Sequence, residues 1–176
     1  MNLKEIIREI PDFPKPGINF KDITPILANG EALRHVIQLL AGHFREKGVD
    51  RIVGVESRGF LFGAPLAYEL GCGFALVRKP GKLPCSVERV EYALEYGTDA
   101  LEIHRDAVGA GQRVLMVDDL LATGGTIGAA MDLVHRLGGE IIGAAFVIEL
   151  AFLGGRARLT ERGVTDILTL VTYDAE

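Results

Sequence analysis

The chain has 176 residues, of which 48% are hydrophobic and 24% are charged. This balance excludes intrinsic disorder, because the chain has ample apolar surface to bury. Its 19 Lys and Arg residues are outnumbered by 24 Asp and Glu residues, and the formal net charge of -5 gives an overall field that would repel nucleic acid. The 22 glycines exceed the roughly 12 that average usage would give, and their irregular spacing excludes collagen and predicts many tight turns.

The chain length and the apolar runs bound the class of protein further. A chain of 176 residues is close to the common size of one domain, so we expect a single domain over residues 1–176. The longest apolar runs are about nine residues, against the roughly 18 needed to span a bilayer, which predicts no membrane partner. Cys72 and Cys85 lack the spacing of a zinc site, and we expect free thiols in a cytosolic protein.

The first half of the chain predicts alternating helices and strands. Residues 1–10 mix Leu and Ile with charged residues, which indicates an amphipathic helix and not a signal peptide. Residues 11–17 contain three prolines and predict an ordered loop or arm. Apolar positions at helical spacing predict a helix from Glu31 to near Gly48. A strand over residues 51–55 and a helix over residues 60–70 follow.

The second half resumes this alternation after an irregular segment. We interpret residues 79–105 as a flexible loop and a hairpin, and long excursions of this kind are usually functional. The other expected elements are strands over residues 73–77, 114–117, 141–148 and 166–171, a helix from about Thr126, and a weaker helix over residues 152–161. Buried strands separated by helices predict an α/β fold with a mainly parallel central sheet flanked by helices.

One segment joins the end of a strand to two acids and a glycine-rich loop. Asp118 and Asp119 follow the strand over residues 114–117, and a small loop then opens the next helix. The loop consists of Ala122, Thr123, Gly124, Gly125 and Thr126, and we call it the phosphate loop. Unpaired N–H groups at a helix N-terminus attract anions, so the loop predicts a phosphate site. The acids can accept hydrogen bonds from sugar hydroxyls or attract a metal.

Other interpretations of these motifs are weaker. The Walker A loop needs a lysine that the phosphate loop lacks, and the dinucleotide fingerprint GxGxxG occurs nowhere in the chain. A serine hydrolase is excluded at Ser57, because Val55 stands where the nucleophile elbow needs glycine. A plain strand-to-helix turn with solvated acids is the remaining alternative. The pairing of two acids with Ala-Thr-Gly-Gly-Thr favours the phosphate site over that turn.

Residues 114–126 resemble the signature of the type I phosphoribosyltransferase family, which binds 5-phosphoribosyl 1-diphosphate. Residues 13–23, 56–60, 78–84 and 94–97 resemble members of this family that act on adenine, and the likeness covers nearly the whole chain. The resemblance implies transfer of the phosphoribosyl group to adenine in purine salvage, with AMP and pyrophosphate as products and Mg²⁺ bound with the diphosphate. It also implies the family fold, a homodimer, an N-terminal hood over about residues 1–30 that contributes to base recognition, and a flexible catalytic loop.

The resemblance also implies which residues bind the sugar phosphate and the diphosphate. The phosphate loop holds the 5-phosphate, and Asp118 and Asp119 bind the ribose hydroxyls near Mg²⁺, with no direct metal ligand assigned. The expected diphosphate residues are Glu56, Ser57, Arg58, Gly59, Arg78, Lys79 and Lys82. Cations suit this role because negative charge develops on the leaving pyrophosphate. The alternative to diphosphate binding is that Arg78 and Lys79 form an ordinary solvated edge.

Glu95, Tyr96 and Arg58 form the catalytic set that the resemblance implies. Glu95 faces N7 of the base, where a carboxylate with an ordinary pKa can accept the N7 proton while N9 attacks C1 of the ribose. Tyr96 covers the closing site, with an exposed loop tyrosine as the alternative.

Adenine recognition is implied for Asn19, Phe20 and Lys21. Phe20 stacks on the purine while backbone groups beside it contact the base. A plain core phenylalanine is the alternative. Many relatives carry arginine where this chain has Lys21, and we expect the change to matter little because the backbone makes the contact.

Two other functions remain open at this point. One is a phosphoribosyltransferase for another nucleobase, which the segments around Phe20 and Glu95 disfavour. The other is a non-catalytic regulator that senses 5-phosphoribosyl 1-diphosphate. Such a regulator should add a basic nucleic-acid surface or an extra domain, and this short acidic chain has neither.

Overall fold

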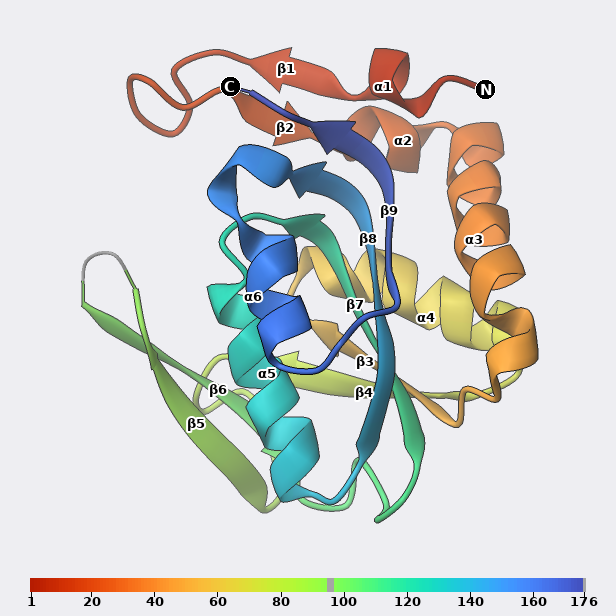
Figure 1. The fold of residues 1–176 in the computed structure, drawn as a ribbon, viewed down its shortest axis with the longest axis vertical. Coiled ribbons are helices and arrows are strands. Elements are labelled where there is room, and N and C mark those ends of the chain that lie inside the picture. The colour runs from red at the N-terminus through yellow and green to blue at the C-terminus, as the bar shows by residue number, and fades with distance from the viewer. Residues whose placement is uncertain (95–96, 176) are drawn as a thin grey trace.

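The computed structural model describes residues 1–94 and 97–175 (Figure 1). Its helices are α1 (Leu3–Ile6), α2 (Thr24–Ala28), α3 (Gly30–Phe44), α4 (Arg58–Leu70), α5 (Gly125–Arg136) and α6 (Gly155–Glu161), with short 3-10 helices η1 (Arg45–Lys47) and η2 (Ala151–Leu153). Its strands are β1 (Arg8–Ile10), β2 (Phe20–Asp22), β3 (Arg51–Val55), β4 (Gly73–Arg78), β5 (Val87–Ala93), β6 (Thr98–His104), β7 (Arg113–Leu121), β8 (Glu140–Leu150) and β9 (Ile167–Tyr173).

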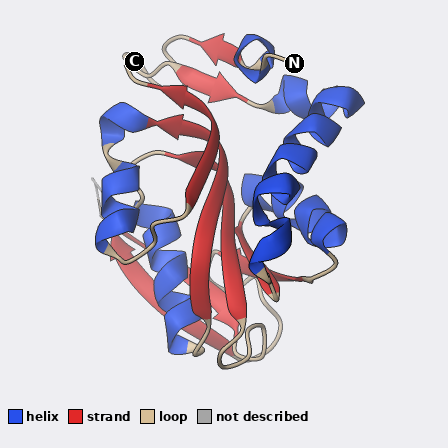
Figure 2. Ribbon diagram, turned by 45° about the vertical axis from the view of Figure 1, so that its right-hand side comes forward, coloured by secondary structure: helices blue, strands red, loops and turns tan. Residues whose placement is uncertain are grey.

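In the described part of the chain, seven strands form one sheet in the order β5-β6-β4-β3-β7-β8-β9. The strands from β4 to β9 in this order run parallel. β5 and β6 form a hairpin, and β6 pairs with β4 in the antiparallel direction. Helices α3 and α4 cover one face, and α5 and α6 cover the other (Figures 1 and 2). The predicted fold class, α/β with a mainly parallel central sheet, is confirmed.

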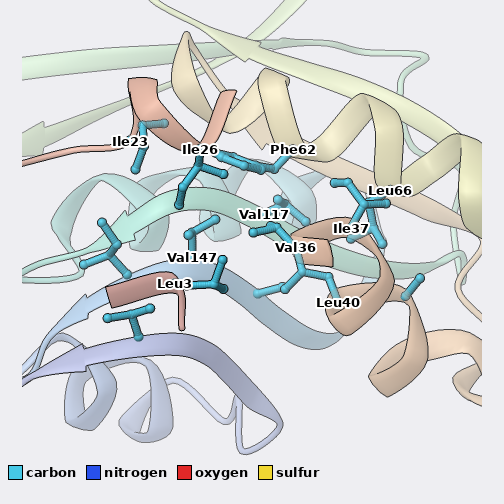
Figure 3. Packing of buried hydrophobic residues seen from close by; sticks show 14 of the residues in the cluster. Leu3, Ile23, Ile26, Val36, Ile37, Leu40, Phe62, Leu66, Val117 and Val147 are labelled. Carbon is cyan, nitrogen blue, oxygen red and sulfur yellow. The ribbon is translucent and has the colours of Figure 1, made fainter. Parts of the chain in front are cut away.

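The central strand β7 shows why both faces are covered. Its residues Leu115 and Val117 pack in the core beneath α3 and α4, while Val114 and Met116 pack in the core beneath α5. Successive side chains of a strand point to opposite faces, and all four of these are fully buried. A strand buried on both faces reads as a continuous apolar run. Figure 3 shows the first of these cores, with Val117 among side chains from the N-terminal helices.

The N-terminal ten residues do not form the single helix that their periodicity predicts. The helix α1 ends at Ile6, and β1 then pairs with β2 in the antiparallel direction, with Glu9 opposite Lys21. The prediction was wrong because this pairing satisfies the backbone groups, and because Lys21 Nζ lies 2.9 Å from a carboxylate oxygen of Glu9. Both contacts are tertiary, and a short helix in water has little stability of its own to oppose them. The β1–β2 sheet lies over the carboxyl ends of β8 and β9 (Figure 1).

Two boundaries nearer the pocket also differ from expectation. β7 continues to Leu121 and includes the two acids, because the long partner β8 pairs with it as far as Leu121 opposite Glu149. The weak helix over residues 152–161 is divided by Gly154, whose φ of +73° separates η2 from α6. The other expected helices and strands are present, and Cys72 and Cys85 are free thiols as predicted. Within residues 1–94 and 97–175, no helix has the length and apolar character needed to cross a membrane.

Candidate active site

The carboxyl ends of β3 and β7 meet at one edge of the sheet. The two strands are parallel neighbours, with Gly54 opposite Val117, so the residues beyond these positions lie side by side. An open pocket of about 470 Å³ is found there. The lining residues are Val55, Glu56, Ser57, Arg58, Lys79, Asp118, Asp119, Leu120, Leu121, Ala122, Thr123, Gly124, Gly125, Thr126 and Ile127. The structure therefore brings together the phosphate loop, both acids and three residues of the segment that follows β3.

Asp118 and Asp119 lie on β7 next to Arg58. Arg58 Nε is 2.8 Å from Oδ2 of Asp119, whose side chain is only 6% exposed, and Oδ1 of Asp118 accepts a hydrogen bond from the Asp119 N–H at 2.9 Å. Burial and the charge of Asp119 raise the pKa of Asp118 well above its usual range. Burial also raises the pKa of Asp119, although the Arg58 guanidinium acts in the opposite direction. Hydroxyl groups that donate hydrogen bonds to this pair would stabilise its charged forms.

The last two residues of the phosphate loop, Gly125 and Thr126, are the first two residues of α5. Gly124 occupies the N-cap position with φ +78°, and the cap makes no side-chain hydrogen bond. Its carbonyl accepts the hydrogen bond of the Gly128 N–H at 3.0 Å, so the helix begins directly after Gly124, within the loop. N–H groups in the first turn of a helix have no intrahelical partner and lie at the positive end of the helix dipole. Here they lie along a pocket, which is the arrangement that binds phosphate.

Gly59 allows α4 to begin against β7. A Cβ on Gly59 would lie 3.0 Å from Oδ1 of Asp118 and 3.0 Å from the carbonyl oxygen of Val117, which is tighter than ordinary contact. Glycine therefore lets the first turn of α4 approach the acids closely and places Arg58 beside them. The expected contact of Gly59 with diphosphate stays a prediction.

Glu56 contacts the basic residues at the end of β4 and in the segment that follows it. Its carboxylate lies 2.7 Å from Lys82 Nζ and 3.5 Å from Arg78 Nη2, and it accepts a hydrogen bond from the Lys79 N–H. Burial would raise the pKa of Glu56, but the hydrogen bonds from Lys82 and Lys79 outweigh it and the pKa is lowered. The Glu56 side chain thus holds the basic segment at the pocket. Of the three basic residues, Lys79 lines the pocket, and Arg78 and Lys82 are placed beside it through Glu56.

The β5–β6 hairpin supplies partners that the sequence interpretation missed. Lys79 Nζ forms an ion pair with Asp99 and lies 3.4 Å from the Tyr92 hydroxyl. The hydrogen bond from Lys79 lowers the pKa of Asp99. Tyr92 and Asp99 are cross-strand neighbours, so the alternating polarity of the hairpin was the signal that could have paired them. The alternative interpretation, an ordinary solvated edge, does not describe Lys79.

The residues expected to bind adenine lie on and before β2. The Phe20 ring is half-buried, with Arg58 Cζ 5.6 Å from its centroid and the Phe13 ring 5.2 Å away. The side chains on either side of Phe20 are engaged elsewhere. Asn19 donates a hydrogen bond to Glu9, and Lys21 is buried with Nζ 4.2 Å from the centroid of the Tyr173 ring. Phe20 is therefore the one member of this set that contacts a pocket residue through its side chain.

Two predicted site residues lie outside the described residues. Glu95 and Tyr96 belong to the segment between β5 and β6, and their roles stay predictions.

Comparisons with known proteins match this chain to proteins that bind the kind of substrate predicted from the sequence. A family model described as the phosphoribosyl transferase domain matches residues 22–168. The adenine phosphoribosyltransferase of Rippkaea orientalis is 58% identical over 175 residues, which cover 98% of this chain and 100% of the relative. The crystal structure of adenine phosphoribosyltransferase from Thermoanaerobacter pseudethanolicus has 57% identity and a TM-score of 0.92, and it covers 97% of each chain.

A further solved structure carries ligands. The adenine phosphoribosyltransferase of Saccharomyces cerevisiae, complexed with D-2,5-dideoxy-2,5-imino-altritol 1,6-bisphosphate and adenine, is 44% identical with a TM-score of 0.88 and covers 96% of each chain. These matches confirm the resemblance found in the sequence, and this chain belongs to the phosphoribosyltransferase family.

Proposed function

We propose that this protein is an adenine phosphoribosyltransferase, which transfers the 5-phosphoribosyl group from 5-phosphoribosyl 1-diphosphate to adenine and gives AMP and pyrophosphate in purine salvage. The observation that carries the proposal is the meeting of the phosphate loop, the acid pair and Arg58 in one pocket. These groups suit the 5-phosphate, the ribose hydroxyls and the diphosphate of one substrate. The relatives named adenine phosphoribosyltransferase, which match nearly the whole chain, support adenine as the base.

The sugar phosphate would bind along the end of β7 and the start of α5. The 5-phosphate accepts hydrogen bonds from the N–H groups of residues 122–126, and the hydroxyls of Thr123 and Thr126 can add to them. The ribose hydroxyls donate to Asp118 and Asp119, which favours the ionised forms of two carboxyl groups whose pKa values are otherwise raised by burial. Substrate binding thereby satisfies groups that the folded chain leaves in an unfavourable environment.

The diphosphate would bind between Arg58 and Lys79, against the main chain around Arg58. Arg78 and Lys82 can join it by exchanging their contacts with Glu56 for contacts with the ligand. Each charge-assisted hydrogen bond contributes about 1.5–3 kcal/mol. A few such contacts suffice to hold a polyanion locally, although the whole chain carries a net charge of -5.

Magnesium fits this pocket as an ion that arrives with the diphosphate. In residues 1–94 and 97–175 no group of three His, Cys, Asp or Glu side chains is arranged to hold a metal. The pocket does contain the carboxyl groups of Asp118 and Asp119, and Mg²⁺ commonly binds through one or two carboxylates, waters and substrate phosphates. When bound, the ion would neutralise charge on the diphosphate.

The transfer itself joins N9 of adenine to C1 of the ribose. The bond between C1 and the diphosphate oxygen breaks, and its electron pair leaves with pyrophosphate. Glu95 accepts the N7 proton of adenine and returns it in the reverse direction, while Tyr96 covers the closing site. Phe20, beside Arg58 at the pocket, stacks on the purine. The roles of Glu95 and Tyr96 are supported by the resemblance of residues 94–97 to the family.

We also propose that the protein works as a homodimer in the cytosol, on the basis of its family membership. Light scattering should give about twice the 19.0 kDa mass of one chain. A monomeric mass at working concentration would contradict the dimer.

The substrate proposal is tested by product formation from a panel of bases. The protein is incubated with 5-phosphoribosyl 1-diphosphate and Mg²⁺, together with adenine, guanine, hypoxanthine or xanthine in turn. We expect adenine to be converted with the highest kcat/KM. Preference for another base would assign the chain to a sister enzyme. Binding of 5-phosphoribosyl 1-diphosphate without any conversion would favour the non-catalytic regulator.

A further inference from the structure

We propose that Glu149 and Arg156 are positioning residues for the 5-phosphate of the substrate. They act through helix α6, which they fix against the phosphate loop. This inference rests on the proposed function, because it takes residues 122–126 as the site of the 5-phosphate. It concerns residues that lie outside the pocket lining.

The first residue of α6 packs directly on the phosphate loop. A Cβ on Gly155 would lie 2.2 Å from the carbonyl oxygen of Ala122 and 2.9 Å from Leu121 Cδ1. From the other side, a Cβ on Gly124 would lie 3.2 Å from the Gly155 carbonyl oxygen and 3.1 Å from Leu159 Cδ1. The two backbones are therefore in contact, with no side chain between them. Any displacement of α6 is transmitted to the loop, because close-packed interiors have little free space to absorb it.

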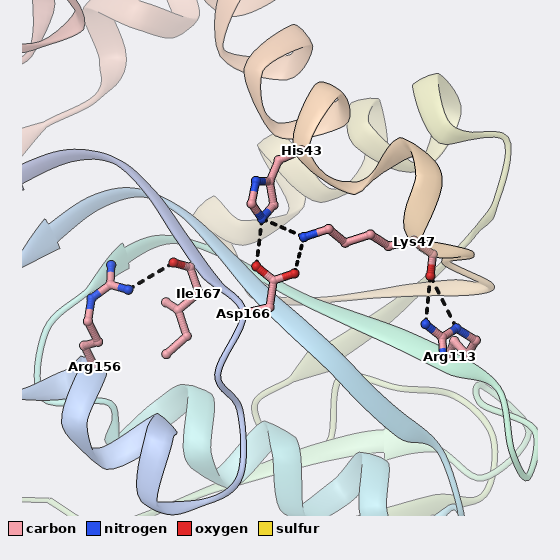
Figure 4. A network of polar contacts seen from close by, with 6 residues as sticks. All are labelled: His43, Lys47, Arg113, Arg156, Asp166 and Ile167. Atoms are coloured by element: carbon pink, nitrogen blue, oxygen red, sulfur yellow. Dashed lines mark hydrogen bonds and ion pairs between the residues drawn. The ribbon is translucent and has the colours of Figure 1, made fainter.

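Arg156 fixes this end of α6 to two strands. Its Nε donates to Glu149 Oε1 at 2.9 Å, and its Nη2 donates to Glu149 Oε2 at 2.6 Å. Nη2 also lies 2.9 Å from Thr169 Oγ1, and Nη1 donates to the Ile167 carbonyl at 3.0 Å. Figure 4 shows Arg156 of α6 directed at that carbonyl. The arginine next to Gly155 is thus tied to β8 and β9 together.

Glu149 makes this attachment directional and strong. Its side chain is 5% exposed, and its oxygens also accept a hydrogen bond from Thr169 at 2.9 Å. The hydrogen bond from Arg156 lowers the pKa of Glu149, so the carboxylate stays charged. A planar guanidinium that binds a carboxylate through two N–H groups allows one orientation. The pair therefore sets where α6 begins.

A separate contact holds the other end of α6. Arg162, just after the helix, donates to the Gly128 carbonyl at 3.1 Å and to Asp132 Oδ1 at 2.7 Å, both on α5. The start of α6 is thus placed by Glu149 and Arg156, and its end by α5. Loss of the first attachment should shift the Gly155 end of α6 while α6 remains folded on α5. This predicts a local effect on the phosphate loop.

The test compares Arg156→Met with Arg113→Met. The Arg113 guanidinium also donates to main-chain carbonyls, those of Lys47 and Gly48 (Figure 4), but Arg113 is the first residue of β7 and makes no contact with α6 or Glu149 among its hydrogen bonds and ion pairs in the described part of the chain. Dissociation constants for ribose 5-phosphate and for inorganic pyrophosphate are measured by calorimetry on the folded proteins. In Arg156→Met we expect the affinity for ribose 5-phosphate to fall roughly tenfold or more. Pyrophosphate affinity and the KM for adenine should stay within about threefold of the parent values.

Rescue and folding controls complete the experiment. Arg156→Lys keeps the charge but loses the two-pronged contact, and it should recover part of the affinity for ribose 5-phosphate. Arg113→Met should lower the unfolding midpoint without changing that affinity. If Arg156→Met does not fold, Glu149→Gln carries the test, with an expected loss of roughly threefold to tenfold.

The inference is overturned if Glu149→Gln and any folded Arg156 variant bind ribose 5-phosphate as the parent does, or if pyrophosphate affinity falls to the same extent. Failure of the proposed function has a different signature. A parent protein that binds ribose 5-phosphate but makes no AMP would refute adenine transfer and would leave the binding comparison valid.

Discussion

Replacement of Gly124 by alanine should weaken binding of the 5-phosphate specifically. Gly124 has φ +78°, and an L residue in this conformation costs roughly 1–2 kcal/mol. Its new Cβ would also lie 3.1 Å from Leu159 Cδ1 and 3.2 Å from the Gly155 carbonyl oxygen, where ordinary contacts begin at 3.4 Å. The phosphate loop must therefore move by a few tenths of an ångström, which misaligns its N–H groups.

The magnitude follows from the hydrogen bonds at stake. Loss of one N–H contact to a charged phosphate costs about 1.5–3 kcal/mol, and about 1.4 kcal/mol corresponds to a factor of ten in affinity. We therefore expect ribose 5-phosphate to bind roughly 10- to 100-fold more weakly to Gly124→Ala. The free energy of unfolding should fall by about 1–2 kcal/mol from the backbone strain alone.

Gly111→Ala is the matched control. Gly111 has φ +76°, close to the value at Gly124, but a Cβ there would meet no atom within 4 Å. It should lose the stability that backbone strain costs, about 1–2 kcal/mol, and keep its affinity for ribose 5-phosphate. Calorimetry gives the affinities, and urea unfolding gives the stabilities. Equal affinity losses in the two variants, or none in Gly124→Ala, would refute the assignment of this loop to the phosphate.

Three other predictions concern the base, the acids and the N-terminal hood. Glu95→Gln should lower kcat by roughly 10² or more while binding of 5-phosphoribosyl 1-diphosphate stays near normal, and a loss below threefold would remove Glu95 from proton transfer. The pKa of Asp118 is raised in the folded state, so the folded chain binds the carboxyl proton of Asp118 more tightly than the unfolded chain does. The free energy of unfolding therefore falls as pH rises above about 3.9, the usual pKa of an aspartic acid. Asp118→Asn should thus be more stable than the parent at pH 7 but not below about pH 4, and an equal gain at both pH values in urea unfolding would contradict this cause. Lys21→Met removes the ion pair between the buried Lys21 and the exposed Glu9, and the contact with the Tyr173 ring, so it should cost about 1 kcal/mol of stability and raise the KM for adenine. Lys21→Arg should preserve both values, and a Met variant with unchanged stability would show that these contacts contribute nothing.

Local patterns predicted most of the sheet because its strands are buried on both faces. β7 contains an apolar run whose alternate side chains enter two cores. Such a run can be recognised as a buried strand without knowing which strands lie beside it. The prediction for residues 1–10 was wrong because their pattern fits a helix as well as a short strand. The strand β2 that pairs with β1, and the buried Lys21, lie further along the chain. The periodicity of residues 1–10 therefore contains no information about them.

The part of the site that is contiguous in the chain could be predicted from local sequence alone. The acids Asp118 and Asp119 and the glycine-bearing phosphate loop follow one another, so covalent spacing alone places two carboxyl groups next to a helix N-terminus. The presence of glycine at position 124 also has a local reason, since Gly124 takes a positive φ. This is why the resemblance of the single segment 114–126 indicated the family.

The way in which the remaining residues meet that segment depends on the tertiary fold. Arg58 reaches Asp119 because β3 and β7 are parallel neighbours, and Glu56 binds the basic residues because β4 lies on the other side of β3. Gly155 contacts Ala122 because α6 folds back over the loop. Strand order and helix placement result from burying two apolar faces at once, and that requirement depends on the whole chain.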